Sequence, residues 1–502
     1  ILTLLVLFLA LVLNCAAWVD FTLVEAVEAH DRWDAIRYLW GADLFLIDEF
    51  SAPLLMLTTL HSLLTVLATL RTKMDRVPYS GILWSQGLTQ GIFCTKAPWL
   101  LMGFMALSVV PPLLDLLRRG KPVRVFVIHM SAHIGLMWAG WGMMATQDRD
   151  SSLFLLGGVL LVLSVLIRSG IAPFHCWVTD LFEHASFGTA ILFVTPMAGA
   201  YAAVRLIMPV APAWSLQWLA LVSVLTSVYA AGMAMVQRES RRFYCYLFLS
   251  HASLVLVGLE TVTPEALTGA LCVWFSSSLS LTGFGLTLRS VEARLGRLSL
   301  KDYHGLYEHM PNLAALFLIT GLAAVGFPGT IGFVSSELLV DGVIHVYPGF
   351  GFAIVLASAL NGISILATYF KLFTGTRYTS TISLQSRLQE RVAVVCLLLI
   401  MIGGGIWPQP FISSRQHAAE HLIQEREERL PEPAPLVNGS SEGIAEAESE
   451  TESDLEASWS MWHLDRRVTE KRLSPASIAI NNTSAYQERK GPTRNRDATS
   501  DH

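Results

Sequence analysis

Residues capable of acid–base or metal chemistry are concentrated in one polar stretch between two apolar runs. The stretch SGIAPFHCWVTDLFEHASFGTAILFVTP, residues 169–196, contains His175, Asp180, Glu183 and His184. A metal site needs ligands that converge, whereas Glu183 and His184 are sequence neighbours that point apart on a helix. We therefore predict no metal site. Two interpretations stay open: a proton-entry role for His175, Asp180 or His184, and a plain surface connection between two helices.

A second group of ionisable residues lies within the apolar runs: His61, His129, His133, His251, Glu337, Asp341 and Lys371. A charge near the centre of a bilayer costs about 3 kcal/mol on insertion scales, so such residues are candidates for function. His129 and His133 share one helix face, where they could relay a proton or hydrogen-bond across a helix interface. Lys371 lies near a helix end and could extend its ammonium group to the membrane surface. The candidate proton-path residues are His129, His133, His175, His251, Glu337 and Lys371.

Membrane-spanning helices must position these residues. Of the 502 residues, 53% are hydrophobic and 15% are charged, and the mean hydropathy is +0.50. Soluble domains carry about 25% charged residues, and runs of about 20 apolar residues match the thickness of a bilayer. We predict an all-α polytopic membrane protein with about fourteen transmembrane helices. The runs are 1–19, 51–70, 79–95, 97–117, 123–145, 153–171, 187–208, 214–236, 243–260, 266–288, 311–329, 331–346, 350–372 and 390–408.

The sequence gives no sign of a cofactor site. The six cysteines are spread singly, without a C-x-x-C pair, so no zinc or iron–sulfur ligand set is present. The glycine-rich match GFGLTL at Gly283 lies inside an apolar run with no strand before it, and is a chance match. The formal net charge of −5 gives no indication of nucleic-acid binding. We expect no cofactor, no metal and no redox site in this chain.

Basic residues indicate the orientation in the membrane. They cluster after the second, fourth, eighth and tenth apolar runs, and the positive-inside rule makes that side cytoplasmic. The clustered residues are Arg71, Lys73, Arg76, Arg118, Arg119, Lys121, Arg124, Arg238, Arg241, Arg242, Arg289, Arg294, Arg297 and Lys301. Arg377, Arg387 and Arg391 fall on the opposite side, so the rule does not orient the last third of the chain.

Proline and glycine interrupt several of the runs. The breaks IAPFHCW at 171–177 and VGFPGTIGF at 325–333 lie about 155 residues apart, and an acidic residue, Asp180 or Glu337, follows each. Proline frees a backbone carbonyl that lipid cannot satisfy, so a break faces protein or a water-filled cavity. A single break can be a packing kink, but paired breaks in transporters mark an ion or substrate site. We predict an internal repeat with one broken helix in each half.

Five motifs occur in a fixed order over about 360 residues: FLIDEFSAPLLMLTTL, APFHCWVTDLFEHAS, RESRRFYCYLFLSHASLVLVGL, GFPGTIGFVSSELLV and GIWPQPF. Together they resemble the antiporter-like membrane subunits of respiratory complex I, most closely the M type. Mrp-type cation/proton antiporters and membrane-bound hydrogenases share that fold. The resemblance implies two inverted five-helix repeats with broken helices, and a central line of charged residues that moves protons. It also implies that NADH and quinone react only in partner subunits.

The charged residues that this family uses for pumping are missing at the matching positions. Alignment on Pro111 places Ala106 where the family has a glutamate. Pro196 or Met197 stands where the family has a central lysine, and Ser277 lies near its third position. A glutamate–lysine pair can switch because each partner shifts the pKa of the other. The standard switch is therefore absent here.

Other positions do match the family. His251 and Glu337 are present, and the pair Arg241–Arg242 stands where the family has Lys-Arg. We therefore predict a divergent subunit that keeps the fold and has lost or rewired the standard proton path.

The predicted organisation has four parts: N-terminal transmembrane helices with an interfacial loop (1–96), an antiporter-like core of two inverted repeats (97–374), a C-terminal transmembrane helix (375–412) and a disordered acidic and basic tail (413–502). The predicted function is a membrane subunit of a complex I-like NADH-quinone oxidoreductase that contributes to proton translocation. The alternatives are a non-pumping structural subunit, or a subunit of an Mrp-type antiporter or an inorganic-carbon uptake complex. Expected partners are other membrane subunits and the lipid bilayer, in a bacterial inner membrane.

Overall fold

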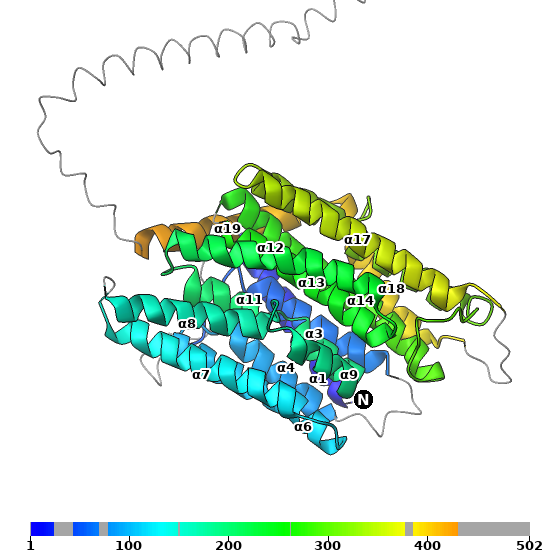
Figure 1. Ribbon diagram of the computed structural model, residues 1–502. Helices are drawn as coiled ribbons and strands as arrows, with labels where there is room; N and C mark the ends of the chain where they lie inside the picture. Colours follow the sequence, from blue (N-terminus) through cyan, green and yellow to red (C-terminus); the bar gives the residue numbers. More distant parts are fainter. Residues whose placement is uncertain are drawn as a thin grey trace, which may run out of the picture. The chain divides into compact units, whose positions relative to one another are not determined.

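The computed structural model describes residues 2–24, 44–69, 79–148, 151–261, 263–376 and 385–429. Over these residues the chain is helical, without a β-strand (Figure 1). Two isolated bridges join Phe45 to Thr95 and Glu239 to Ser299. Each of the apolar runs predicted from the sequence coincides with a helix or with a broken helix. The prediction of an all-α membrane protein is therefore confirmed.

The helices, in chain order, are α1 (Leu2–Val24), α3 (Ala52–Leu67), α4 (Tyr79–Phe93), α5 (Pro98–Ser108), α6 (Val110–Arg118), α7 (Arg124–Thr146), α8 (Ser152–Ser169), α9 (Cys176–His184), α10 (Phe187–Val194), α11 (Ala198–Ala202), the π-helical η2 (Ala203–Ile207), α12 (Ala213–Val236), α13 (Ser240–Glu260), α14 (Pro264–Leu295), α15 (Pro311–Ala324), α16 (Ile331–Ile344), α17 (Pro348–Phe373), α18 (Leu388–Ile406) and α19 (Gln409–Arg429).

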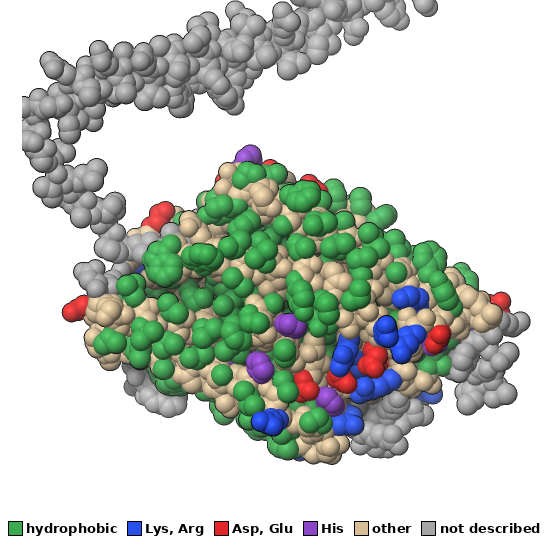
Figure 2. Space-filling view, viewed as in Figure 1, with side chains coloured by type: hydrophobic (Ala, Val, Ile, Leu, Met, Phe, Trp, Pro, Cys, Tyr) green, Lys and Arg blue, Asp and Glu red, His purple; other side chains and the backbone are tan. Residues whose placement is uncertain are grey.

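The surface is apolar where a bilayer would surround it. Among the described residues, 9 helical segments are long and apolar enough to cross a membrane, and α3 and α15 are shorter apolar helices. Large side chains point outward from them; Phe352 is 71% exposed and Leu399 is 67% exposed. Figure 2 shows apolar side chains over most of one face and charged side chains gathered at one end. Such a surface is unfavourable in water and favourable against lipid, so the chain is a multi-pass integral membrane protein.

Neighbouring helices pack closely around α14. This helix of 32 residues is the longest of the described elements, and α13, α15, α16, α18 and α19 contact it. Figure 1 shows α7 beside α8 along one flank of the bundle, and α12, α13 and α17 lying together. The contact between α7 and α8 depends on two glycines, because a Cβ added at Gly140 would lie 2.7 Å from the carbonyl oxygen of Gly157. Small residues of this kind allow helices to approach closely in a membrane.

The two predicted helix breaks are present and have the same backbone feature. Gly170, with φ of 69°, follows α8 and precedes Pro173. Gly326, with φ of 80°, lies just after α15 and precedes Pro328. Both glycines adopt the left-handed conformation that residues with a Cβ rarely take. The two halves of the chain therefore each contain one helix that is broken in the same way, as the repeat predicts.

Buried side chains reach carbonyl groups next to both breaks. The Trp177 indole donates to the Ile167 carbonyl at 2.7 Å, within the last turn of α8. A ring nitrogen of His251 lies 2.9 Å from the Ala324 carbonyl, at the last residue of α15. Both side chains are buried. Protein side chains therefore satisfy these carbonyl groups, which lipid could not do.

The boundary predicted for the disordered tail is wrong. Residues 413–429, assigned to the tail, belong to α19, which packs against α14. The charged composition is misleading because Arg415 is buried and donates to the Glu49 and Phe50 carbonyls at 2.6 and 3.4 Å. Arg426 likewise donates to the Met208 and Ala211 carbonyls. The rest of the predicted tail, 430–502, lies outside the described residues.

Candidate functional site

The two histidines of α7, predicted to relay a proton or to hydrogen-bond across a helix interface, have different environments. His133 is buried, and its Nδ1 lies 2.8 Å from the Ser164 hydroxyl on α8. The same hydroxyl donates to the His133 carbonyl at 3.0 Å. His129 is only partly buried, and its Nδ1 contacts the Val125 carbonyl of its own helix at 2.8 Å. The structure therefore brings His133, but not His129, into the interior.

Arg168 lies one turn after Ser164 and was not among the predicted residues. Its side chain is only 4% exposed, and the guanidinium carbon lies 4.1 Å from the ring centre of Phe193 and 5.8 Å from that of Trp177. No carboxylate pairs with it in the described part of the chain, and its Nε has no hydrogen-bond partner. The Nε2 atom of His133 is also buried without a partner. A buried cation thus lies at the first helix break, near an imidazole with one unused nitrogen.

His251 occupies the second helix break. Its Nε2 lies 2.9 Å from the Ala324 carbonyl, and its Nδ1 lies 2.8 Å from the Leu247 carbonyl. A neutral imidazole donates from one nitrogen only, whereas a protonated ring donates from both. The neighbouring Ser250 accepts a hydrogen bond from Asn361 of α17 at 2.8 Å. Protonation of His251 would therefore change the hydrogen bonding at the break itself.

The structure places uncharged residues at the family's pumping positions. Ala106 lies in α5 and is partly buried. Pro196 and Met197 form the break between α10 and α11, where Met197 adopts a left-handed φ of 52°. Such a conformation costs a non-glycine residue about 1–2 kcal/mol. Ser277 is buried in α14.

The other candidates predicted within the apolar runs, Glu337, Asp341 and Lys371, lie in α16 and α17. Glu337 is exposed on α16. Asp341, one turn later, is 75% exposed and lies 3.6 Å from His345. Lys371 is partly buried in the last turn of α17. Its backbone carbonyl accepts a hydrogen bond from the His304 amide.

The polar stretch that contains α9 does not converge on one point. His175 packs edge-on against Tyr229, with ring centres 5.4 Å apart. Asp180 instead pairs with His184 of its own helix at 3.1 Å. Burial lowers the pKa of His175 and raises that of Asp180. Among the described residues, no group of three His, Cys, Asp or Glu side chains could hold a metal ion.

Both arginines of the family-like pair form ion pairs at the basic end of the bundle. Arg241 binds Glu292 through two nitrogens at 2.7 and 2.8 Å. Arg242 binds Glu183 of α9 at 2.6 Å. Their geometry fits a structural role in joining α9, α13 and α14.

A second interior charge pair escaped the sequence reasoning. Arg205 of η2 pairs with Asp48, in the motif FLIDEF, and their side chains are only 6% and 13% exposed. Arg205 also donates to the Tyr201 hydroxyl at 3.2 Å. Burial favours the neutral acid, but Arg205 and the hydrogen bonds from Ser51 outweigh it and hold the pKa of Asp48 below its ordinary value. The sequence signal for this pair was an aspartate, Asp48, next to a strongly apolar run. Its partner, Arg205, lies 157 positions away in the sequence.

The fold, with its broken helices, is that of the antiporter-like membrane subunits. Residues 125–361 match the family model described as "NADH:quinone oxidoreductase/Mrp antiporter, TM". This part of the chain is similar to that family, and M-type subunits are among the relatives that the whole chain resembles. NADH-quinone oxidoreductase subunit M of Pseudomonas aeruginosa is 24% identical over 470 residues, which cover 83% of this chain and 90% of the relative.

Two solved structures share the fold. A chain in the Mrp complex from Dietzia sp. DQ12-45-1b has a TM-score of 0.73 at 17% identity, covering 85% of this chain and 94% of that one. A chain in respiratory complex I from Thermus thermophilus with bound NADH has a TM-score of 0.72 at 22% identity, covering 85% and 95%.

Proposed function

We propose that this chain is a membrane subunit of a complex I-like NADH-quinone oxidoreductase and contributes to proton translocation coupled to electron transport. The observation that carries the proposal is His251, whose ring lies between two carbonyl oxygens at the second helix break. NADH and quinone would react in partner subunits. Other membrane subunits would be its partners, and a bacterial inner membrane its location.

The proton path would differ from the family's pattern. Arg168 would supply a fixed positive charge at the first break, because a guanidinium stays protonated. Histidine is the side chain best suited to gain and lose a proton near neutral pH, so His133 and His251 would carry the exchange. Buried hydroxyls such as Ser164 and Ser250 lie beside them and can both donate and accept.

A second candidate function is a non-pumping structural subunit. The uncharged Ala106, Pro196 or Met197, and Ser277 favour it, because none of these side chains changes its charge near neutral pH. The family model also covers Mrp antiporters, so an antiporter subunit is the third candidate.

A conservative substitution distinguishes these candidates. His251→Gln keeps an amide donor for the Ala324 carbonyl but cannot be protonated near neutral pH. The complex purified with its partner subunits, placed in liposomes, should oxidise NADH normally but transport fewer protons per electron, measured with a pH-sensitive dye. The matched control is His129→Gln, at a partly buried position outside the interior, and it should transport as the wild type does. Equal proton-to-electron ratios in all three proteins would favour the structural subunit, and a purified complex without iron–sulfur subunits would favour the antiporter.

A further inference from the structure

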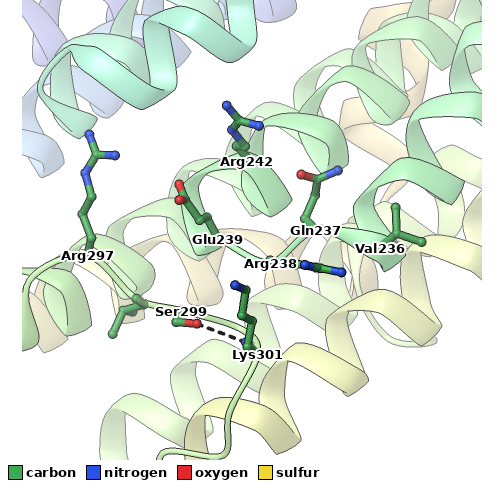
Figure 3. Close-up of a pocket in the computed structure, with 9 residues that line it drawn as sticks. Val236, Gln237, Arg238, Glu239, Arg242, Arg297, Ser299 and Lys301 are labelled. Atoms are coloured by element: carbon green, nitrogen blue, oxygen red, sulfur yellow. Dashed lines mark hydrogen bonds between the residues drawn. The ribbon is translucent and has the colours of Figure 1, made fainter.

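A basic pocket lies at the membrane surface, away from the two helix breaks. It has a volume of about 470 Å³ and lies between the end of α12, the start of α13 and the segment that follows α14. Four cationic side chains, from Arg238, Arg242, Arg297 and Lys301, line it together with one carboxylate, Glu239. Figure 3 shows Lys301 extending toward the segment that carries Arg238, with Arg242 above Glu239 and Arg297 farther along the segment that carries Lys301. The charge of the pocket is therefore strongly positive.

Two of the four cations already have partners. Arg242 donates to the Glu183 carboxylate at 2.6 Å, and Arg297 donates to the Glu183 carbonyl. The side chains of Arg238 and Lys301 form no ion pair with any residue that the structure describes. Two cations in this pocket are thus available for a negatively charged ligand.

The backbone beneath these side chains is fixed by hydrogen bonds between the two segments. The Leu300 amide donates to the Arg238 carbonyl at 2.8 Å, and the Ser240 amide donates to the Leu298 carbonyl at 3.2 Å. Ser240 also begins α13, a helix of 21 residues, so its N-terminal end adds a partial positive charge. The pocket is therefore a built feature of the fold rather than a chance cluster of surface lysines and arginines.

Apolar side chains border the pocket on its membrane side. Val236, which lines it, is 66% exposed, and the preceding Met235 is 40% exposed. Tyr303, two residues after Lys301, is 61% exposed, and tyrosine is enriched at the level of lipid headgroups. The pocket thus lies at the ends of membrane-spanning helices, with an apolar face of α12 leading away from it.

From this arrangement we infer that the pocket binds the phosphate group of an anionic phospholipid. Arg238 and Lys301 bind the phosphate, and the acyl chains lie along the exposed end of α12. A soluble anion would use the two cations but would leave Met235 and Val236 uncovered. Basic pockets at the ends of transmembrane helices have the chemistry that anionic headgroups require.

The test is a lipid titration of the full chain, purified in detergent with the subunits that accompany it. Native mass spectrometry should show phosphatidylglycerol binding that phosphatidylcholine does not reproduce. The R238Q/K301Q variant should bind phosphatidylglycerol about thirtyfold more weakly, because two cations near the headgroup are lost. The matched control is K121Q/R124Q, which removes two exposed cations, one from the loop before α7 and one from the first residue of α7, and should bind as the wild type does.

Three outcomes would overturn the inference. They are unchanged binding in R238Q/K301Q, equal weakening in the K121Q/R124Q control, and binding of inorganic phosphate that excludes the lipid at equal concentration. The charge-retaining R238K/K301R variant tests whether a loss of binding comes from misfolding. It should keep both the wild-type melting temperature and the wild-type lipid affinity. Loss of binding in that folded variant would also contradict the role assigned to the two charges.

Discussion

Arg168 and Arg205 are both almost completely buried in the membrane part of the protein, yet the same substitution should affect them in opposite ways. Arg205 pairs with Asp48, and the side chains are 6% and 13% exposed. Arg168 is 4% exposed, has no carboxylate partner among the described residues and is stabilised by the ring of Phe193 at 4.1 Å. Methionine has a similar length and no charge, so it tests each charge directly.

The expected magnitudes follow from these environments. Arg205→Met leaves Asp48 as an uncompensated buried charge, which should cost about 3–5 kcal/mol. Arg168→Met removes a charge that costs about 3 kcal/mol to place in the bilayer and gives up a cation–π contact of about 2 kcal/mol. The Arg168 variant should therefore be about 1 kcal/mol more stable than the wild type.

Equilibrium unfolding in detergent, followed by tryptophan fluorescence, measures both free energies. The D48N/R205M double variant is the control, because neutralising Asp48 should recover most of the stability lost in R205M. If R168M lowered stability as much as R205M does, Arg168 would have a counter-charge, and the account of the first break would be refuted. A stable R168M complex that transports fewer protons would show that the charge is kept for function.

Three further predictions follow from single contacts. The contribution of Asp48 to stability should be lost only below about pH 4, because the pKa of Asp48 is held below its ordinary value and the ion pair is lost as the carboxylate is protonated; acid titration of the unfolding free energy should show a smaller fall below that pH in Asp48→Asn. Arg415→Met should lower the free energy of unfolding by about 2 kcal/mol or more, because two carbonyl groups lose their donor. Limited proteolysis should then cleave α19 in this variant. In the control Gln416→Met, which changes an exposed side chain, α19 should stay protected. Gly170→Ala should lower the melting temperature more than Gly296→Ala. Both glycines have a positive φ, but only at Gly170 would an added Cβ meet a side chain, that of Val178 at 2.7 Å. Equal losses of melting temperature would show that Val178 can move aside.

The membrane-spanning helices and the two breaks were predictable because they depend on local sequence. An apolar run of bilayer length, and a proline or glycine inside it, act within a few residues. The breaks at Gly170 and Gly326 follow from those rules without knowledge of neighbouring helices.

The interior charges were not predictable in the same way. Arg168 stands at the end of its helix, where an arginine usually extends to the membrane surface, and only the packing of Phe193 over it shows that it is buried. Glu337 and His129 were chosen because they interrupt apolar runs, but the sequence alone does not say which face of a helix points inward. Arg415 lies in a charged segment whose stability depends on carbonyl groups more than 360 positions away.

The contacts of α19 have a consequence for how the protein is made. Arg415 of this helix hydrogen-bonds to residues just before α3, and Arg426 hydrogen-bonds to residues just after η2. The ribosome synthesises α19 after all the helices that α19 contacts. Until α19 has been made, those carbonyl groups therefore lack their hydrogen-bond donors. A chain interrupted before this helix would expose them, and membrane quality-control proteases would have a local signal that distinguishes an unfinished chain from a finished one.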